Sequence, residues 1–279
     1  MKAIVLTFDK YMMLTDHMIS RYKWMWPNNP FVYYIPFQHD DVKKHFENKY
    51  GDKVQLIKTP SDIVRTMRVL LDSIQDEEWI YWCMDDRYPI QIELTKMNQV
   101  YNWIHTMNAP DVTGIRCINY PFGRMPENIY YFKNSIRNQY GMKFLKRKNN
   151  YNMIWAHQFL RSKVLKRLFS EIPLELKAAK DMDYIVEKLQ LPADQNMYVL
   201  KSNIISLGES SSRGKITQNC YESLLINGFQ IPKEFEISNK NMYYKEEYPL
   251  ISSSYLFLKL ILKKIMTKIG LSTINKKRQ

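Results

Sequence analysis

The alternation of short apolar runs with helical patterns over the first 85 residues constrains the fold most strongly. Four apolar runs are separated by three stretches of helical periodicity. The expected strands are 2–8, 31–35, 54–58 and 79–84, with Pro36 ending the second, and the expected helices are 15–26, 40–50 and 61–74. Because parallel strands need crossover connections of this kind, the pattern predicts an α/β fold with a mostly parallel sheet flanked by helices.

The remaining sequence is less regular. It predicts helices at 90–107 and 179–189, a strand running into a helix over 153–169, and strands at 112–118 and 198–205, of which the second is expected to be the last. The segment 208–215 is rich in glycine and serine and is expected to be the most flexible loop.

Composition excludes several classes of protein. With 45% hydrophobic residues the chain can bury a sizeable core, and the three cysteines are too far apart for a zinc site or a disulfide framework. No run of about 18 uncharged apolar residues is present, and the first apolar stretch is too short for a signal peptide, so we expect a cytoplasmic protein. No glycine-rich loop follows the first strand, which argues against an NAD enzyme and a P-loop NTPase.

The net charge of +13 is concentrated at the C-terminus. No acidic residue follows Glu247, whereas seven basic residues do, and over 255–279 the apolar and basic side chains separate onto two sides of a helical wheel. Such a helix is typical of contact with an anionic membrane; an ordinary helix packed on the body of the protein is the alternative. No nucleic-acid motif accompanies the charge, so DNA or RNA partners are not expected.

The fourth expected strand ends in Asp85-Asp86-Arg87. Ligands of open α/β sheets bind beyond the carboxyl ends of the strands, so a site is expected at these residues. Two adjacent carboxylates repel each other unless a divalent cation such as Mg²⁺ or Mn²⁺, or a pair of ribose hydroxyls, uses them. In the alternative interpretation the two aspartates only end a strand and cap a turn.

Residues 1–210 resemble the GT-A glycosyltransferases, nucleotide-sugar enzymes with one Rossmann-like domain, here of the bacterial polysaccharide or lipopolysaccharide type. The residues that carry the resemblance are Asp85-Asp86-Arg87, the preceding helix with Asp62, Arg65 and Arg68, and the later Trp155 and Asp181-Met182-Asp183-Tyr184. Asp85-Asp86-Arg87 stands where the family has an acidic motif that holds the nucleotide diphosphate through a metal. The resemblance implies Asp85 near the ribose and Asp86 on Mg or Mn; Arg87 departs from the motif and could itself meet the diphosphate.

The resemblance also implies that Thr7, Phe8 and Asp9 bind the nucleotide base and that Asp181 or Asp183 is the general base. Arg65, Arg213 and Lys215 join Asp85 as nucleotide-binding candidates because they are cations, the last two in a loop with glycines that could close over the diphosphate. Trp155, which could stack on a sugar face, and the nearby His157 are the acceptor-binding candidates. The two candidate bases point about 200° apart on a helix, so only one can face the sugar. Each position has a structural alternative: Asp9 as a turn residue, Arg213 and Lys215 in a solvated linker, Trp155 and His157 in the core, and Asp181 and Asp183 at a helix N-terminus.

The prediction from the sequence is therefore a metal-assisted glycosyltransferase (EC 2.4 class) that moves a sugar from a nucleotide-sugar donor to a glycan or lipid-linked acceptor in cell-surface polysaccharide synthesis. Residues 1–250 form the catalytic domain, with a nucleotide-binding half over about 1–110 and an acceptor half over about 111–250, and 251–279 form a membrane-associating tail on the inner face of the cell membrane. Inversion of the anomeric centre is favoured. A nucleotidyltransferase and a non-catalytic membrane-associated binding protein are the alternatives.

Overall fold

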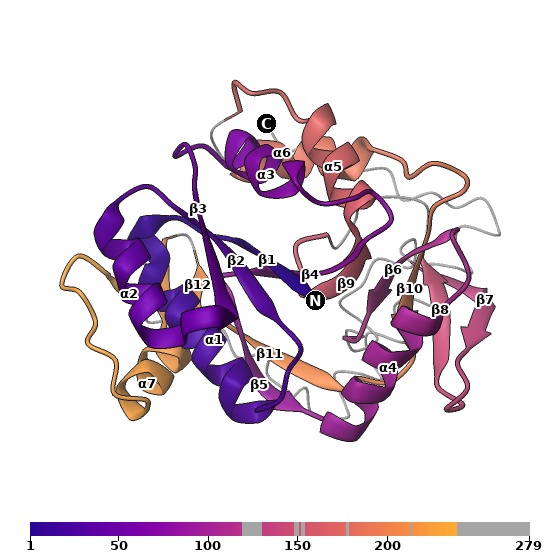
Figure 1. Cartoon of the computed structure of the whole chain (residues 1–279), viewed down its shortest axis with the longest axis horizontal. Helices are drawn as coiled ribbons and strands as arrows, with labels where there is room; N and C mark the ends of the chain where they lie inside the picture. The colour runs from indigo at the N-terminus through magenta and orange to yellow at the C-terminus, as the bar shows by residue number, and fades with distance from the viewer. Residues whose placement is uncertain (119–129, 148–150, 152–153, 177–178, 213, 239–279) are drawn as a thin grey trace, which may run out of the picture. The chain divides into compact units, whose positions relative to one another are not determined.

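A nine-stranded sheet forms the centre of the computed structural model (Figure 1). The structure describes residues 1–118, 130–147, 151, 154–176, 179–212 and 214–238. The chain divides into two units, Met1–Asn119 with Glu127–Met242, and Tyr120–Pro126 with Tyr243–Gln279, and all described residues belong to the first. The predicted tail 251–279 lies outside them.

The strand order is β3-β2-β1-β4-β9-β6-β10-β8-β7. Neighbouring strands run parallel from β3 to β4 and between β6 and β10, whereas β9 and β8 run antiparallel to their neighbours. The bounds are β1 Lys2–Leu6, β2 Val32–Phe37, β3 Val54–Lys58, β4 Trp79–Met84, β6 Val112–Arg116, β7 Tyr130–Arg137, β8 Lys143–Arg147, β9 Gln158–Arg161 and β10 Asn196–Leu200. The predicted α/β fold with a mostly parallel sheet is confirmed.

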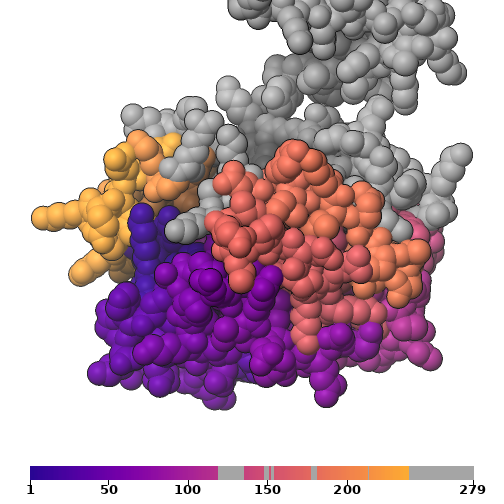
Figure 2. Space-filling model, turned by 90° about the horizontal axis from the view of Figure 1, so that it is seen from above, coloured from indigo at the N-terminus to yellow at the C-terminus, as the bar shows by residue number. Residues whose placement is uncertain are grey.

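Helices cover both faces of the sheet. Their bounds are α1 Met12–Met25, α2 Asp40–Tyr50, α3 Ile63–Asp72, α4 Leu94–Thr106, α5 Ser162–Glu171, α6 Ala179–Lys188 and α7 Gln218–Ile226, with short 3₁₀ turns at Asp9–Tyr11 and Gly51–Lys53. Val5 and Cys83 face the core formed with α1, α2, α4 and α7, whereas Ile4 and Trp82 face the core formed with α3, α5 and α6. Both faces of β1 and β4 are therefore buried, which explains their unbroken apolar sequences. Helix α3 contacts α5, and in Figure 2 the purple surface to which α3 belongs adjoins the salmon surface to which α5 belongs.

Two small sheets lie outside the main sheet. β5 (Arg87–Ile92) pairs antiparallel with β11 (Ile205–Glu209), and β12 (Ser211–Ser212), β13 (Lys215–Thr217) and β14 (Ile237–Ser238) form the other. Among the described residues no helix combines the length and the hydrophobicity that crossing a bilayer requires.

Several predicted boundaries are wrong. Pro36 does not end β2, which continues to Phe37: β1 pairs with β2 only as far as Tyr34, so beyond this point one edge of β2 is open and a residue without an N–H is tolerated. The predicted helix 90–107 begins only at Leu94, because the preceding residues pair with β11 as β5.

The end of the described chain also differs from the prediction. The predicted last strand 198–205 is divided between β10 and β11, which belong to different sheets. The segment 208–215, predicted as a flexible loop, contains the end of β11, all of β12 and the start of β13. Long-range hydrogen bonds hold it: the Ser210 N–H donates to the Asp86 carbonyl at 2.6 Å, and the Thr217 N–H donates to the Ser210 carbonyl at 3.0 Å.

Candidate functional site

Asp85 lies at the carboxyl edge of the sheet, directly after β4 and beside the end of β1. The two strands are parallel neighbours with Leu6 in register with Met84, and the Asp85 N–H donates to the Leu6 carbonyl at 3.2 Å. Thr7, which follows β1, donates its hydroxyl to Asp85 Oδ2 at 2.6 Å, and the Thr15 hydroxyl of α1 donates to Thr7 Oγ1 at 2.7 Å. The sheet and α1 thus fix the orientation of this carboxyl group.

Burial raises the pKa of Asp85 to about 8, the nearby charge of Asp86 raises it as well, and the hydrogen bond from Thr7 opposes both effects. The carboxyl group of Asp85 therefore lies where water solvates its charged form poorly. A cation placed beside Asp85 would favour the charged form of its carboxyl group. Asp85 is therefore suited to bind a cation or the hydroxyl group of a ligand.

Asp86 is the more accessible of the two aspartates. Its side chain is 46% exposed, yet its Oδ1 is buried and accepts no hydrogen bond from any described residue. Arg87 Nε lies 3.9 Å from this oxygen. Burial raises the pKa of Asp86, Arg87 lowers it, and Glu209 raises it. Asp86 thus offers a carboxylate oxygen whose hydrogen-bonding capacity is unused within the described structure.

Glu209 joins this site, although the sequence analysis did not single it out. It lies opposite Arg87 in the β5–β11 ladder, and its Oε1 is 3.9 Å from Arg87 Nη2. The apolar residues Ile205 and Leu207 alternate with the polar or small residues at 206 and 208, and this alternation was the available signal for a strand. Nothing local indicated which strand it would pair with.

Asp9 holds the ends of β1 and β2 together. Its carboxylate accepts the N–H of Gln38 at 3.0 Å and that of His39 at 2.7 Å, and it lies 2.7 Å from His39 Nδ1. It therefore serves the turn before α2, while Phe8 next to it is half-buried. These contacts agree with the alternative interpretation of Asp9 as a turn residue.

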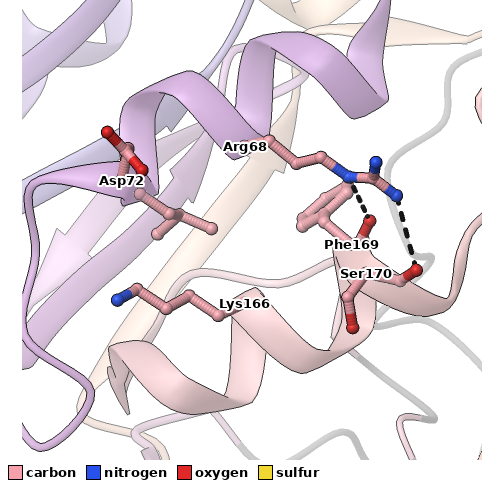
Figure 3. A pocket seen from close by; sticks show the side chains of 6 residues that line it. Arg68, Asp72, Lys166, Phe169 and Ser170 are labelled. Carbon is pink, nitrogen blue, oxygen red and sulfur yellow. Dashed lines mark hydrogen bonds between the residues drawn. The ribbon is translucent and has the colours of Figure 1, made fainter.

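Arg65 and Arg68 lie on α3 with different surroundings. Arg65 is exposed and pairs with Asp62 at 3.3 Å, within the first turn. Arg68 donates to the carbonyls of Phe169 and Ser170 at the end of α5, as Figure 3 shows. This end of α5 borders an open hollow of about 440 Å³ lined by Arg68, Leu71, Asp72, Lys166, Phe169 and Ser170. None of these residues contacts Asp85 or Asp86, so the hollow is not part of the site.

His157 lies inside the core. It is 1% exposed, with Nδ1 2.7 Å from the Tyr22 hydroxyl and Nε2 3.1 Å from the Met84 backbone nitrogen. Burial lowers its pKa to about 3. Trp155 is half-buried and packs near Phe169, with ring centroids 6.4 Å apart. Both contacts are those of core residues.

Asp181 and Asp183 are both exposed on α6, on either side of the buried Met182. No hydrogen bond or ion pair within the described structure joins either of them to Asp85 or Asp86. Lys215 is exposed and pairs with Glu236, and Arg213 lies outside the described residues. The structure thus brings together Thr7, Asp85, Asp86, Arg87 and Glu209.

The described part of the chain contains no group of three or more histidine, cysteine or acidic side chains arranged to hold a metal ion. The acids nearest one another at the carboxyl edge are Asp85, Asp86 and Glu209, with the Arg87 guanidinium between the last two. A divalent ion there would have two adjacent carboxylates as protein ligands.

Comparison with known proteins finds similarity in fold. No family model matches the chain, and no curated protein matches its sequence. S. aureus TarS 1–349 is 14% identical with a TM-score of 0.43, and the match covers 73% of this chain but only 58% of that one. The galactosyltransferase LgtC, solved with donor and acceptor sugar analogues, is 12% identical with a TM-score of 0.39, covering 93% and 96%. A 4-diphosphocytidyl-2C-methyl-D-erythritol synthase from Anaerococcus prevotii is 8% identical with a TM-score of 0.37, covering 81% and 95%.

Proposed function

We propose that this chain is a glycosyltransferase of the GT-A kind, which transfers a sugar from a nucleotide-sugar donor to a hydroxyl of a glycan or lipid-linked acceptor. The observation that carries the proposal is the adjacent pair Asp85 and Asp86 at the carboxyl edge of a parallel sheet, one locked by Thr7 and the other presenting a buried oxygen without a hydrogen-bond donor. This is the arrangement that the resemblance of residues 1–210 implies for the diphosphate end of the donor.

The residues present fit a divalent cation. Mg²⁺ and Mn²⁺ prefer hard oxygen ligands and are commonly bound through one or two carboxylates together with substrate phosphates. Asp86 would hold the ion, with Asp85 beside it. When bound, the ion would neutralise charge on the departing diphosphate.

The chain's own residues supply the remaining parts. The hydroxyl of Thr7 fixes the Asp85 carboxyl group, and the Arg87 guanidinium lies close enough to Asp86 to stabilise an anion bound there. The acceptor hydroxyl must lose its proton to a base. Asp181 and Asp183 are both solvent-accessible carboxylates, and the resemblance assigns this role to one of them. The basic tail 255–279 would hold the enzyme at the anionic inner face of the membrane, where a lipid-linked acceptor lies.

The proposal is tested by thermal-shift titration with UDP, GDP, CMP and dTDP, each with and without Mn²⁺. The wild type should gain several degrees with one of these nucleotides, more so with Mn²⁺, because a ligand that binds only the native state stabilises it. Asp86→Ala should lose the metal-dependent part. Asp52→Ala is the matched control and should behave as the wild type, because it removes an exposed carboxylate from the 3₁₀ turn before β3. No shift with any nucleotide would favour a non-catalytic binding protein.

Product analysis separates the proposal from a nucleotidyltransferase, since paired carboxylates and a metal also suit that reaction. A glycosyltransferase incubated with a sugar nucleotide releases the nucleoside diphosphate or, for a CMP-sugar, the monophosphate. A nucleotidyltransferase instead consumes a nucleoside triphosphate and a sugar phosphate and releases pyrophosphate. Pyrophosphate release without sugar-nucleotide turnover would contradict the proposal.

A further inference from the structure

Arg87 lies between two carboxylates. Its Nε is 3.9 Å from Asp86 Oδ1, and its Nη2 is 3.9 Å from Glu209 Oε1. Arg87 and Glu209 are each only 18% exposed, so their charges interact through a medium less screening than bulk water. The two carboxylates therefore share one guanidinium.

The backbone sets the position of Glu209. Glu209 is directly opposite Arg87 in the antiparallel β5–β11 ladder, where opposed Cβ atoms lie about 5 Å apart. The next residue along, Ser210, donates its N–H to the Asp86 carbonyl at 2.6 Å. Strand register thus places the Glu209 carboxylate beside the Arg87 guanidinium, which also lies near Asp86.

If the proposed function is correct, two cations compete for the Asp86 carboxylate, namely the Arg87 guanidinium and a divalent metal ion. A guanidinium that paired closely with Asp86 would occupy the oxygen that a divalent cation needs, and like charges would repel the incoming ion. Glu209 attracts the same guanidinium and so competes with Asp86 for it. The distances on the two sides of Arg87 are equal, as expected for a cation held between two anions.

We infer that Glu209 is a positioning residue that holds the Arg87 guanidinium off Asp86, which leaves the Asp86 carboxylate accessible to a divalent cation. The inference rests on the proposed function, because it takes the cation to bind at Asp85 and Asp86. Glu209 acts here through Arg87 and is not itself a ligand of the ion.

A double-mutant cycle with Mn²⁺ alone as the probe tests the inference. Mn²⁺ binding is measured by isothermal titration calorimetry on the full chain as wild type, Glu209→Gln, Arg87→Gln and the double variant. Glu209→Gln should weaken Mn²⁺ binding by about 5-fold, since Arg87 then pairs more closely with Asp86, and Arg87→Gln should strengthen it by a similar factor. In the Arg87→Gln background, Glu209→Gln should have almost no effect.

Further variants separate this role from a general loss of negative charge. Glu209→Asp keeps the charge with a shorter reach and should fall between the wild type and Glu209→Gln. Glu222→Gln, which removes an exposed acid on α7, is the matched control and should leave Mn²⁺ binding unchanged. Equal melting temperatures of the variants without metal verify that each one folds.

The results of the double-mutant cycle and of the nucleotide titration test the inference and the proposed function separately. An equal loss from Glu209→Gln with and without Arg87 would mean that Glu209 acts on the ion directly, and would overturn the inference, as would an unaltered affinity in Glu209→Gln. If the wild type binds a nucleotide but no Mn²⁺, the proposed sugar transfer survives and the inference on Glu209 fails. If the cycle behaves as expected but no nucleotide binds, Glu209 has the inferred role and the proposed function fails.

Discussion

His157 shows how a single buried residue couples folding to pH. Its ring lies between the Tyr22 hydroxyl of α1 and the Met84 backbone of β4, and burial lowers its pKa to about 3, with the charge of Arg87 acting in the same direction. An unfolded histidine has a pKa of about 6.5. Between these values the unfolded chain binds a proton that the folded ring does not, so stability falls as the pH falls through this window.

We expect His157→Gln to reduce this acid sensitivity. One proton contributes a slope of about 1.4 kcal/mol per pH unit, and the variant should lack that contribution between pH 6 and 4.5, although its stability at pH 7 should be lower because core hydrogen bonds change. Urea unfolding at several pH values measures the slope. His105→Gln, on the exposed surface of α4, should retain the wild-type slope, and equal slopes in wild type and His157→Gln would contradict the assignment.

At the scale of elements, the start of α3 depends on one side chain. Asp62 is its N-cap, and its carboxylate accepts the Arg65 N–H at 2.9 Å. Replacing an N-cap aspartate by alanine costs about 1 kcal/mol, so Asp62→Ala should lower the free energy of unfolding by this amount. Ser61→Ala should have a much smaller effect. Denaturant unfolding compares the two, and equal losses would show that the cap is shared.

The β5–β11 pair depends on a glycine. A Cβ at Gly208 would lie 2.7 Å from the Tyr88 ring, which is buried and packs on His17 with centroids 4.7 Å apart. Gly208→Ala must therefore displace the ring and should cost about 1–3 kcal/mol. In a Tyr88→Leu background the same change should cost less, because the clashing ring atoms are gone. Thermal unfolding of the four proteins gives the coupling, with Ser206→Ala on the same strand as control.

The elements also show what the sequence could reveal. The boundaries of α2, β3 and β4 were predicted correctly because apolar periodicity and nearby capping and turn residues determine them locally. Asp85 and Asp86 directly follow β4, as the end of the apolar run at Met84 predicted. Glu209 was missed because only the pairing of β5 with β11 brings it to Arg87, and a single sequence carries no signal for that register.

At the scale of the whole molecule, charge is divided unevenly along the chain. The net charge is +13, and the seven basic residues after Glu247 account for 7 of it, leaving 13 − 7 = +6 for the rest. The described residues form two apolar cores of their own, which pack on the two faces of the main sheet. We therefore expect the folding of this unit and attachment to a membrane to be separable properties of the protein.

Removal of residues 253–279 tests this separation. The truncated protein should keep its far-ultraviolet circular dichroism and unfold cooperatively, but should no longer sediment with vesicles of phosphatidylcholine and phosphatidylserine, because each basic residue near an anionic surface contributes about 1 kcal/mol. A full chain with Lys259, Lys263, Lys264 and Lys268 replaced by glutamine keeps the apolar side and should bind these vesicles more weakly, and with less dependence on salt. Vesicle binding by the truncated protein equal to that of the full chain would place the membrane contact on the α/β unit instead.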